Sequence, residues 1–226
     1  MSVIPQPPSR RSELKARTRA KLLEAAITTL IEEGYAGFSM NKVAKRAGIA
    51  QPSFYHHFTS TDELLEALAQ DALDRFIKPF QRSVQTMVQN LPQEQARELI
   101  HRLFITALDI CHQQRDLVKM VWAERQQPTS PLGRQLRQLF TEIKQVWGDL
   151  LVRIGLVGTS PHHQLRLSLF MDGMFALFET YALAWIDGRY DDRDTLAQAL
   201  TDYVLFYWQQ EMADYFRSDR SDSEST

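Results

Sequence analysis

The sequence predicts an all-α protein. Apolar residues recur at helical spacing along most of the chain, no segment alternates in the manner of a strand, and only nine of the 226 residues are glycine. Proline and glycine instead mark the joints between apolar-periodic segments. We therefore expect a small N-terminal group of three helices followed by a larger helical bundle.

The first helix is predicted over residues 12–33, where the lysine, arginine and apolar positions have helical spacing. Gly34 is expected to end it. Its apolar stripe consists of Leu22, Leu23, Ala26, Ile27, Leu30 and Ile31. Residues 1–11 are rich in proline and carry Arg10 and Arg11, so they are expected to form a flexible basic arm.

The next two helices are predicted to form a helix-turn-helix. Ser39 can cap a helix that runs to about Ala47, and Gly48 suits a left-handed turn. The following helix covers about residues 51–58, with Pro52 in its first turn, where a missing N–H costs little. Ala44 supplies the small side chain where the two helices cross. The apolar residues expected to pack the two helices together are Val43, Ile49, Phe54 and Phe58.

The rest of the chain predicts helices separated by proline and glycine. Residues 60–63 read Ser-Thr-Asp-Glu, a capping box for a fourth helix that Pro79 should kink or end. Further helices are expected near residues 93–114, 116–126, 132–154, 162–186 and 193–216. The polar segment 217–226 is predicted to be a disordered tail.

Charge divides the chain into a basic beginning and an acidic remainder. Residues 1–60 hold nine Lys or Arg against four acids, whereas the remainder holds 17 against 24. This asymmetry fits contact with a polyanion at one end only, although ordinary charge scatter remains the alternative.

Polar side chains left over by the helix-turn-helix are expected to face DNA. Gln51 and Ser53 can hydrogen-bond base edges, whereas Tyr55 and the histidines can donate to phosphate. The candidate DNA-contacting residues are Arg19, Ser39, Lys42, Lys45, Arg46, Gln51, Pro52, Ser53, Tyr55, His56 and His57. The alternative is a helical hairpin that has no nucleic-acid partner.

Residues 12–65 resemble the N-terminal domain of TetR-family transcriptional regulators. The resemblance rests on residues 18–26, Gly34-Tyr35, Phe38-Ser39, Val43-Ala44, 47–49, 54–58 and Leu64-Leu65. It implies a homodimer with a C-terminal ligand-binding and dimerisation domain, in which an effector releases a near-palindromic operator. Many members carry Lys where this chain has Thr61, and a non-Lys residue there occurs in members that regulate fatty-acid metabolism.

The expected organisation is therefore a basic arm (1–11), a helix-turn-helix domain (12–60), a ligand-binding and dimerisation domain (61–216) and a tail (217–226). The helix over 162–186 and the last helix are apolar nearly all round, which favours packing on a second copy; burial within one monomer is the alternative. Asp172 and Glu179 share a stripe of the first of these helices and are expected to pair with a local Arg or across the dimer rather than to anchor a ligand.

A ligand pocket in the body would be lined by aromatic and apolar residues. The candidates are Phe104, Leu108, Trp122, Phe140, Trp147, Phe170, Met174 and Phe178. Side chains of this kind at helical spacing are also typical of plain core.

Other function classes receive no support from the sequence. The histidines and Cys111 form no convincing metal set, so neither a metal nor a cofactor is expected. No catalytic motif stands out, and no uninterrupted apolar stretch reaches the length of a membrane span. We expect a cytoplasmic regulator that is not an enzyme and whose partners are double-stranded DNA, a second copy and a small apolar or amphipathic effector. A helical protein-interaction module is the alternative.

Overall fold

The computed structural model describes residues 9–79, 81–82, 96–153 and 161–223, with the backbone alone for residues 76, 96, 146–153, 161–163, 208 and 210–223. All regular structure in these ranges is helical, which confirms the predicted class. The chain forms two compact units, Met1–Asp74 with Asp116–Arg137, and Arg75–Arg115 with Gln138–Thr226. The first unit thus includes segments that lie beyond the boundary predicted at residue 60.

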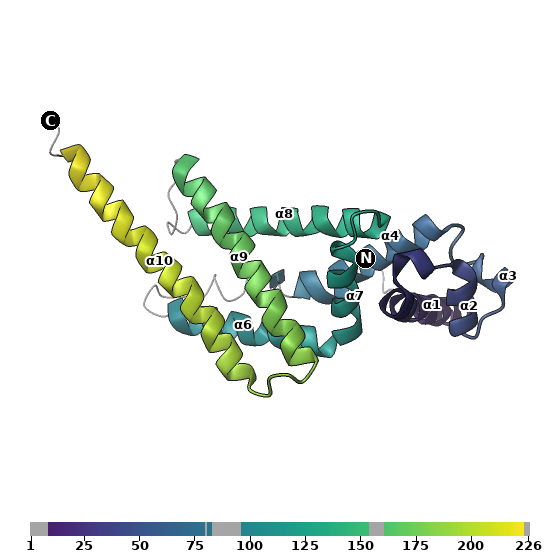
Figure 1. Ribbon diagram of the computed structural model, residues 1–226. Helices are drawn as coiled ribbons and strands as arrows, with labels where there is room; N and C mark the ends of the chain where they lie inside the picture. Colours follow the sequence, from purple (N-terminus) through teal and green to yellow (C-terminus); the bar gives the residue numbers. More distant parts are fainter. Residues whose placement is uncertain (1–8, 80, 83–95, 154–160, 224–226) are drawn as a thin grey trace, which may run out of the picture. The chain divides into compact units, whose positions relative to one another are not determined.

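The helices follow the predicted order (Figure 1). Their bounds are α1 Arg10–Gly37, α2 Met40–Arg46, α3 Gln51–Phe54, α4 Thr61–Ala72, the π-helical η1 Leu73–Ile77, α6 Ala96–Gln113, α7 Arg115–Arg125, α8 Pro131–Arg153, α9 Pro161–Ile186 and α10 Arg193–Ser223.

Helix α1 begins earlier than the sequence predicted. The backbone N–H of Ser12 donates to the hydroxyl of Ser9 at 3.3 Å, so Ser9 is the cap, and Arg10 and Arg11 are helical rather than part of a loose arm. Gly34 has φ 64° and breaks the helical conformation, as expected. The predicted apolar stripe is buried or half-buried except at Ile31, which is exposed.

Pro79 distorts its helix instead of ending it. The π-helical segment η1 occupies residues 73–77, and helical residues follow at 78–79 and 81–82. Proline lacks an N–H and its ring clashes with the carbonyl four residues earlier, which here belongs to Arg75. The guanidinium of Arg75 donates to the Gln114 side-chain oxygen at 2.9 and 2.6 Å and ties this distorted turn to the end of α6.

In the first unit, the corner between α7 and α8 is closed by a buried carboxyl group. The Ser130 hydroxyl donates to Glu124 at 2.6 Å and accepts from the backbone N–H of Gly133 at 3.1 Å. Burial raises the pKa of Glu124. A Cβ at Gly133 would lie 2.3 Å from the Glu124 carbonyl oxygen, so the corner needs glycine there.

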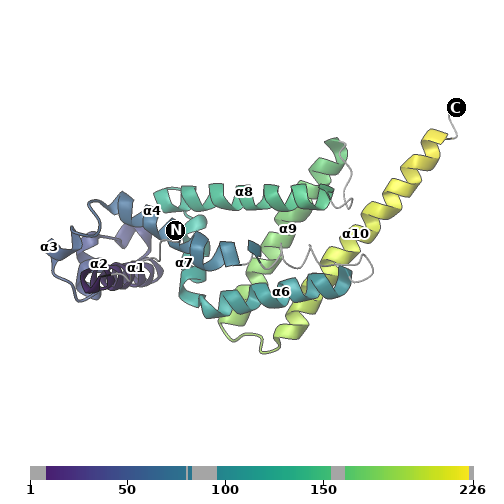
Figure 2. The ribbon, with the colours of Figure 1, turned by 180° about the vertical axis from the view of Figure 1, so that it is seen from behind.

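In the second unit, α10 packs against α6 and α9 (Figure 2). The Phe170 ring stacks on Tyr203 and Tyr207 of α10, with ring centroids 5.7 and 4.0 Å apart. A Cβ at Gly173 would lie 2.7 Å from the Tyr203 hydroxyl, so glycine permits this crossing. The backbone of α10 continues to Ser223, whereas the sequence analysis ended this helix at 216 and predicted disorder beyond it.

One expectation about membranes needs correction. The segment Gln164–Ile186 of α9, 23 residues long, is apolar enough by length and composition to cross a bilayer. Arg166, Asp172 and Glu179 interrupt this segment, so the prediction that no uninterrupted apolar stretch reaches the length of a span does not exclude it. The core helix of a soluble protein passes the same test, so this property does not identify a membrane protein.

Candidate DNA-binding site

Local hydrogen bonds build the turn between α2 and α3. Ser39 caps α2 by accepting from the backbone N–H of Lys42 at 3.4 Å. Gly48 has φ 67°, and its N–H donates to the Lys45 carbonyl while Ile49 donates to Ala44 at 2.9 Å. This double closure is a Schellman motif, which needs a residue that tolerates positive φ. The predicted roles of Ser39 and Gly48 in this turn are confirmed.

Helix α3 is half as long as predicted. It covers residues 51–54, and the chain continues through turn-like hydrogen bonds, such as His57 N–H to the Phe54 carbonyl at 2.8 Å. Its start has no side-chain cap, but the backbone N–H groups of Ser53 and Phe54 donate to the Ala50 carbonyl at 2.9 and 3.2 Å. Phe54 and Phe58 are fully buried, as are Val43 and Ala44 of α2.

This packing leaves the candidate reading residues on the outside. Gln51, Pro52 and Ser53 are exposed on α3, and Tyr55 and His56 are exposed on the turn that follows. Within the first unit, α3 lies at an outer edge, with α2 beside it (Figure 1). The exposed groups include amide, hydroxyl and imidazole groups, all of which can hydrogen-bond bases or phosphates.

His57 differs from its neighbour because it is half-buried. Its Nδ1 is buried and makes no hydrogen bond with described residues. Burial lowers the pKa of His57, and the nearby charges of Lys15 and Arg19 lower it further. The imidazole is therefore neutral at pH 7 and acts as a polar group rather than as a cation.

Arg19 links α1 to the segment after α3. Its guanidinium lies 4.3 Å from the centroid of the Phe58 ring, a cation–π contact. Its positive charge also contributes to the lowered pKa of Glu63, although the larger cause is the hydrogen bond from the Thr59 N–H. Arg19 thus holds the end of the reading segment against α1 and remains only half-buried.

The predicted capping box at the start of α4 is present in a shifted form. The Ser60 hydroxyl accepts from Glu63 N–H at 3.1 Å. The Glu63 carboxylate reaches back to the N–H and hydroxyl of Thr59, each at 2.7 Å, rather than to Ser60. Thr61 occupies the first position of α4 and brings no cation to this point.

The three cations of α2 are not equivalent. Lys42 forms an ion pair with Glu33, and Arg46 forms one with Glu32 at 2.5 Å. Lys45 is exposed and has no ion-pair partner among the described residues. The sequence analysis named all three as phosphate contacts and missed both glutamates. Two adjacent acids at the end of a helix, close to a basic helix, were the available signal.

The predicted ligand-binding residues do not gather at one place but belong to several separate packing contacts. In the second unit, Phe104 stacks on Phe178 with ring centroids 6.3 Å apart, whereas Phe170 belongs to the α9–α10 stack. Phe140 and Leu108 are buried there, Met174 is half-buried, and the first unit buries Trp122. The side chain of Trp147 lies outside the described residues. These positions fit a packed core, and their role as ligand contacts stays a prediction.

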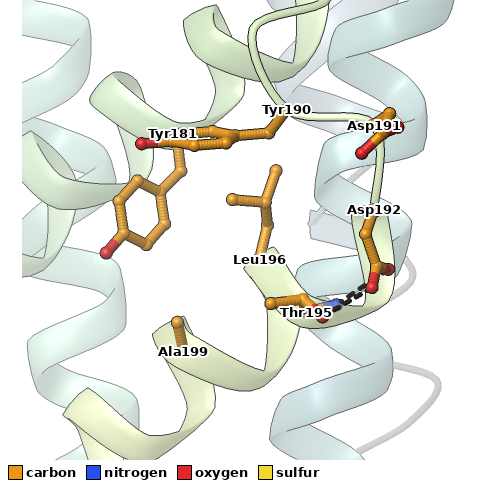
Figure 3. A pocket seen from close by; sticks show the side chains of 7 residues that line it. All are labelled: Tyr181, Tyr190, Asp191, Asp192, Thr195, Leu196 and Ala199. Atoms are coloured by element: carbon orange, nitrogen blue, oxygen red, sulfur yellow. Dashed lines mark hydrogen bonds between the residues drawn. The ribbon is translucent and has the colours of Figure 1, made fainter.

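A surface hollow of about 260 Å³ lies where α9 turns into α10 (Figure 3). Tyr181 and Tyr190 form two sides of it, and Leu196 and Ala199 lie along α10. Asp192, at its rim, caps α10 by accepting hydrogen bonds from Thr195, which lowers the pKa of Asp192. None of the predicted ligand residues lines this hollow.

Further predictions concern the cysteine, metal-ligating and charged side chains in the described ranges. Cys111 is fully buried, and burial raises the pKa of its thiol far above the ordinary range. No group of three or more His, Cys, Asp or Glu side chains in the part of the chain that the structure describes could hold a metal ion. Asp172 pairs with Lys144 of α8, 28 residues away in sequence, rather than with the local arginine that was expected.

Comparison with known sequences identifies relatives of the N-terminal part. Residues 22–68 match the family described as bacterial regulatory proteins, tetR family. An uncharacterized HTH-type transcriptional regulator of Mycobacterium bovis is 36% identical over 70 residues, and one of Mycobacterium tuberculosis is equally similar. These matches cover 31% of this chain and 36% of each relative, so the chain spans about a third of their length.

Comparison with solved structures covers the whole fold. A TetR-like transcriptional regulator from a Rhodococcus species aligns with 91% of this chain and 98% of its own, at TM-score 0.66 and 19% identity. FadR from Bacillus subtilis, solved in complex with stearoyl-CoA, covers 81% of this chain and 95% of its own at TM-score 0.61 and 16% identity. The fatty acid degradation regulator FadR from Bacillus halodurans covers 88% and 97% at TM-score 0.64 and 17% identity. At these identities the likeness establishes the fold.

Proposed function

We propose that the chain is a TetR-family regulator that binds operator DNA as a homodimer and is released by a small effector, a proposal supported by the family match over residues 22–68. The observation that carries this proposal is the α2–α3 segment. Its large apolar side chains are buried or half-buried, and most of its exposed side chains are polar ones that suit the major groove.

Base reading is assigned to α3 and the turn that follows. Gln51 and Ser53 are placed to reach base edges, whereas Tyr55, His56 and His57 contact phosphates. Lys45 and the exposed cations at the start of α1, such as Lys15, add sequence-independent attraction. Ser39 and Pro52 border this surface at the beginnings of α2 and α3.

Dimerisation is assigned to α9 and α10. Large apolar side chains on these helices are exposed in the single chain, with Leu169 and Phe206 each 64% accessible. Leu165 and Tyr203 add to the same kind of surface. Covering this surface with a second copy would remove it from water, which supports the dimer over burial within one monomer. In such a dimer the two α3 segments bind half-sites separated by about 34 Å, one helical turn of DNA, or a multiple of it.

The proposed effector is an apolar or amphipathic molecule with an acyl-like chain. Two structural neighbours are named as FadR proteins, and one was solved with stearoyl-CoA. The aromatic core contributed by α6, α8 and α9 is compatible with such a ligand. Stearoyl-CoA, with free coenzyme A as the control, tests this assignment: only the acylated compound should raise the melting temperature and release DNA.

An electrophoretic mobility shift tests the DNA-binding assignment. The full chain should bind DNA from upstream of its own gene more tightly than a random duplex of equal length, and the affinity should fall steeply with salt. Absence of a specific shift at every salt concentration would contradict the proposal. Light scattering on the same sample should give the mass of two chains.

We assign the protein to the cytoplasm, where it would meet DNA, and regard repression as its mode of action. Its relatives are regulators, and we propose no catalytic role. The alternative, a helical interaction module, makes a different forecast. In that case Tyr55→Ala with His56→Ala would leave the cellular phenotype unchanged, whereas loss of regulation by this variant supports the DNA-binding role.

A further inference from the structure

Two glutamates at the end of α1 hold two of the three cations of α2. Lys42 Nζ contacts the Glu33 carboxylate and donates to the Gly37 carbonyl at 2.9 Å. The Arg46 guanidinium lies 2.5 Å from the Glu32 carboxylate and 3.9 Å from the Glu33 carboxylate. Lys45, between them in sequence, has no such partner among the described residues. Helix α2 therefore carries two ion-paired cations and, among the described residues, one cation without an ion-pair partner.

The chain geometry favours these pairs. The two acids are consecutive on α1, and the connection to α2 is short. Gly37 is the last residue of α1, and a Cβ there would be 2.9 Å from the Glu33 Cβ and 3.3 Å from its carboxylate oxygen. Glycine therefore leaves the room that the Glu33–Lys42 contact uses. The hydrogen bond from Arg46 lowers the pKa of Glu32, which keeps this carboxylate charged at neutral pH.

The pairs remain open to competition from outside. The side chains of Lys42 and Glu33 are 49% and 31% exposed, and those of Arg46 and Glu32 are 31% and 54% exposed. Exposed ion pairs are weak because water and salt screen them. A phosphate that approached either cation could therefore replace its carboxylate partner, at the expense of leaving a negative charge close to the DNA.

We propose that Glu32 and Glu33 compete with DNA phosphates for Arg46 and Lys42, and that this competition lowers the affinity for DNA of any sequence and makes that affinity less dependent on salt. The inference rests on the proposed DNA-binding function and deepens it. Phosphate contacts supply nearly all of non-specific binding, whereas specific binding also uses base contacts. Holding two cations internally therefore reduces the sequence-independent part of the affinity, for the operator and for random DNA alike.

The test is a salt series with the full chain, a random-sequence duplex and the duplex from upstream of its own gene. Glu32→Gln and Glu33→Gln should each free a cation and steepen the salt slope on random DNA by about 0.9. That change corresponds to roughly a threefold larger loss of affinity between 50 and 200 mM salt. The slope on the upstream duplex should steepen by the same amount, so the ratio of operator to random affinity should stay unchanged in both variants.

Glu13→Gln is the matched control. Glu13 is an exposed acid in the first turn of the same helix, so its replacement changes the net charge equally but releases no ion-paired cation among the described residues. If the slopes of Glu32→Gln and Glu33→Gln equal that of Glu13→Gln, the inference is wrong. Circular dichroism on every variant confirms that the fold is retained.

A double-mutant cycle shows whether Glu32 acts through Arg46. Arg46→Gln removes the partner, so the added Glu32→Gln change should then alter the slope no more than Glu13→Gln does. A persistent effect would overturn the inference in favour of a general field effect. If the unmodified protein binds neither duplex at 50 mM salt, the proposed function fails and this inference fails with it. If it binds and only the variants show no change, the proposed function stands alone.

Discussion

The α2–α3 pair and the α9–α10 pair share the same type of turn but expose different side chains, polar on the first pair and apolar on the second. Each first helix ends in a Schellman motif around a glycine, with φ 67° at Gly48 and 68° at Gly188. The hydrogen bonds correspond one to one: Ile49 N–H donates to Ala44, and Arg189 N–H donates to Ala184, both at 2.9 Å. The same backbone device therefore serves both ends of the chain.

What differs is the side chains that each pair leaves outside. Around α2 and α3 the outer residues are mainly polar, such as Gln51 and Lys45, and the helices have seven and four residues. On α9 and α10 the outer residues include Leu169 and Phe206, and the helices have 26 and 31 residues. A polar exterior on a short pair suits a polyanion, whereas an apolar exterior on a long pair suits another protein surface.

The largest effect should come from placing charge on the apolar surface. Leu169→Glu with Phe206→Glu should convert the dimer to a monomer, because the new carboxylates would be desolvated at the interface. Affinity for a two-half-site duplex should fall at least about 100-fold as avidity is lost. Light scattering measures the first change and a mobility shift the second. Leu14→Glu, a change at an exposed leucine of α1, should leave the dimer intact.

The next effect separates two roles within the polar surface. Gln51→Ala should reduce discrimination between operator and base-substituted duplexes by about 1–3 kcal/mol, since a base contact is lost. Lys45→Ala should weaken binding to all duplexes alike and reduce the salt slope by about 0.9. Equal changes in sequence preference for both variants would contradict the division of roles.

A smaller and equal effect is expected at the two shared turns. A Cβ at Gly48 or Gly188 meets nothing within 4 Å, so alanine costs only the strain of positive φ. Each substitution should lower the free energy of unfolding by about 1–2 kcal/mol. Urea unfolding provides the measurement. Only Gly48→Ala should also impair DNA affinity at saturating dimer concentration; a matching loss in Gly188→Ala would show that the turns are not functionally separate.

The smallest effect concerns how the second helix of each pair begins. Helix α3 lacks a side-chain cap, whereas Asp192 caps α10. The hydrogen bonds from Thr195 hold the pKa of Asp192 below its unfolded value, so its stabilisation is present above about pH 4 and is lost as pH falls through the folded pKa. Asp192→Asn should therefore flatten the decline of melting temperature below pH 4. Asp191→Asn, at the exposed neighbouring position, is the control.

The features that were predictable depend on neighbours in sequence. Ser39, Gly48 and Ser60 form caps and turns with residues at most five positions away, and all three took their expected roles. The buried faces of α2 and α3 followed in the same way from helical periodicity. The all-α class rested on periodicity over the whole chain, which averages out local errors.

Some of the features that were missed depend on partners farther along the chain. Lys42 and Arg46 meet glutamates nine and 14 residues away, across a connection whose path the sequence does not reveal. Helix α3 ends at Phe54, where the N–H groups of His56 and His57 donate to carbonyls three residues back, a tighter turn that helical periodicity did not predict. Pro79 was expected to kink or end its helix; a π-helical turn precedes it and helical residues follow it, so only the ending is excluded.

The contact between Gly173 and Tyr203 has a consequence for how such chains can diverge. A Cβ at 173 would meet the Tyr203 hydroxyl at 2.7 Å but its ring carbon only at 3.8 Å, so a side chain at 173 requires that hydroxyl to shift or to be absent. Relatives with alanine or serine at 173 should therefore favour phenylalanine or a smaller residue at 203. A substitution that removes the Tyr203 hydroxyl would thus make a larger residue at position 173 easier to accept.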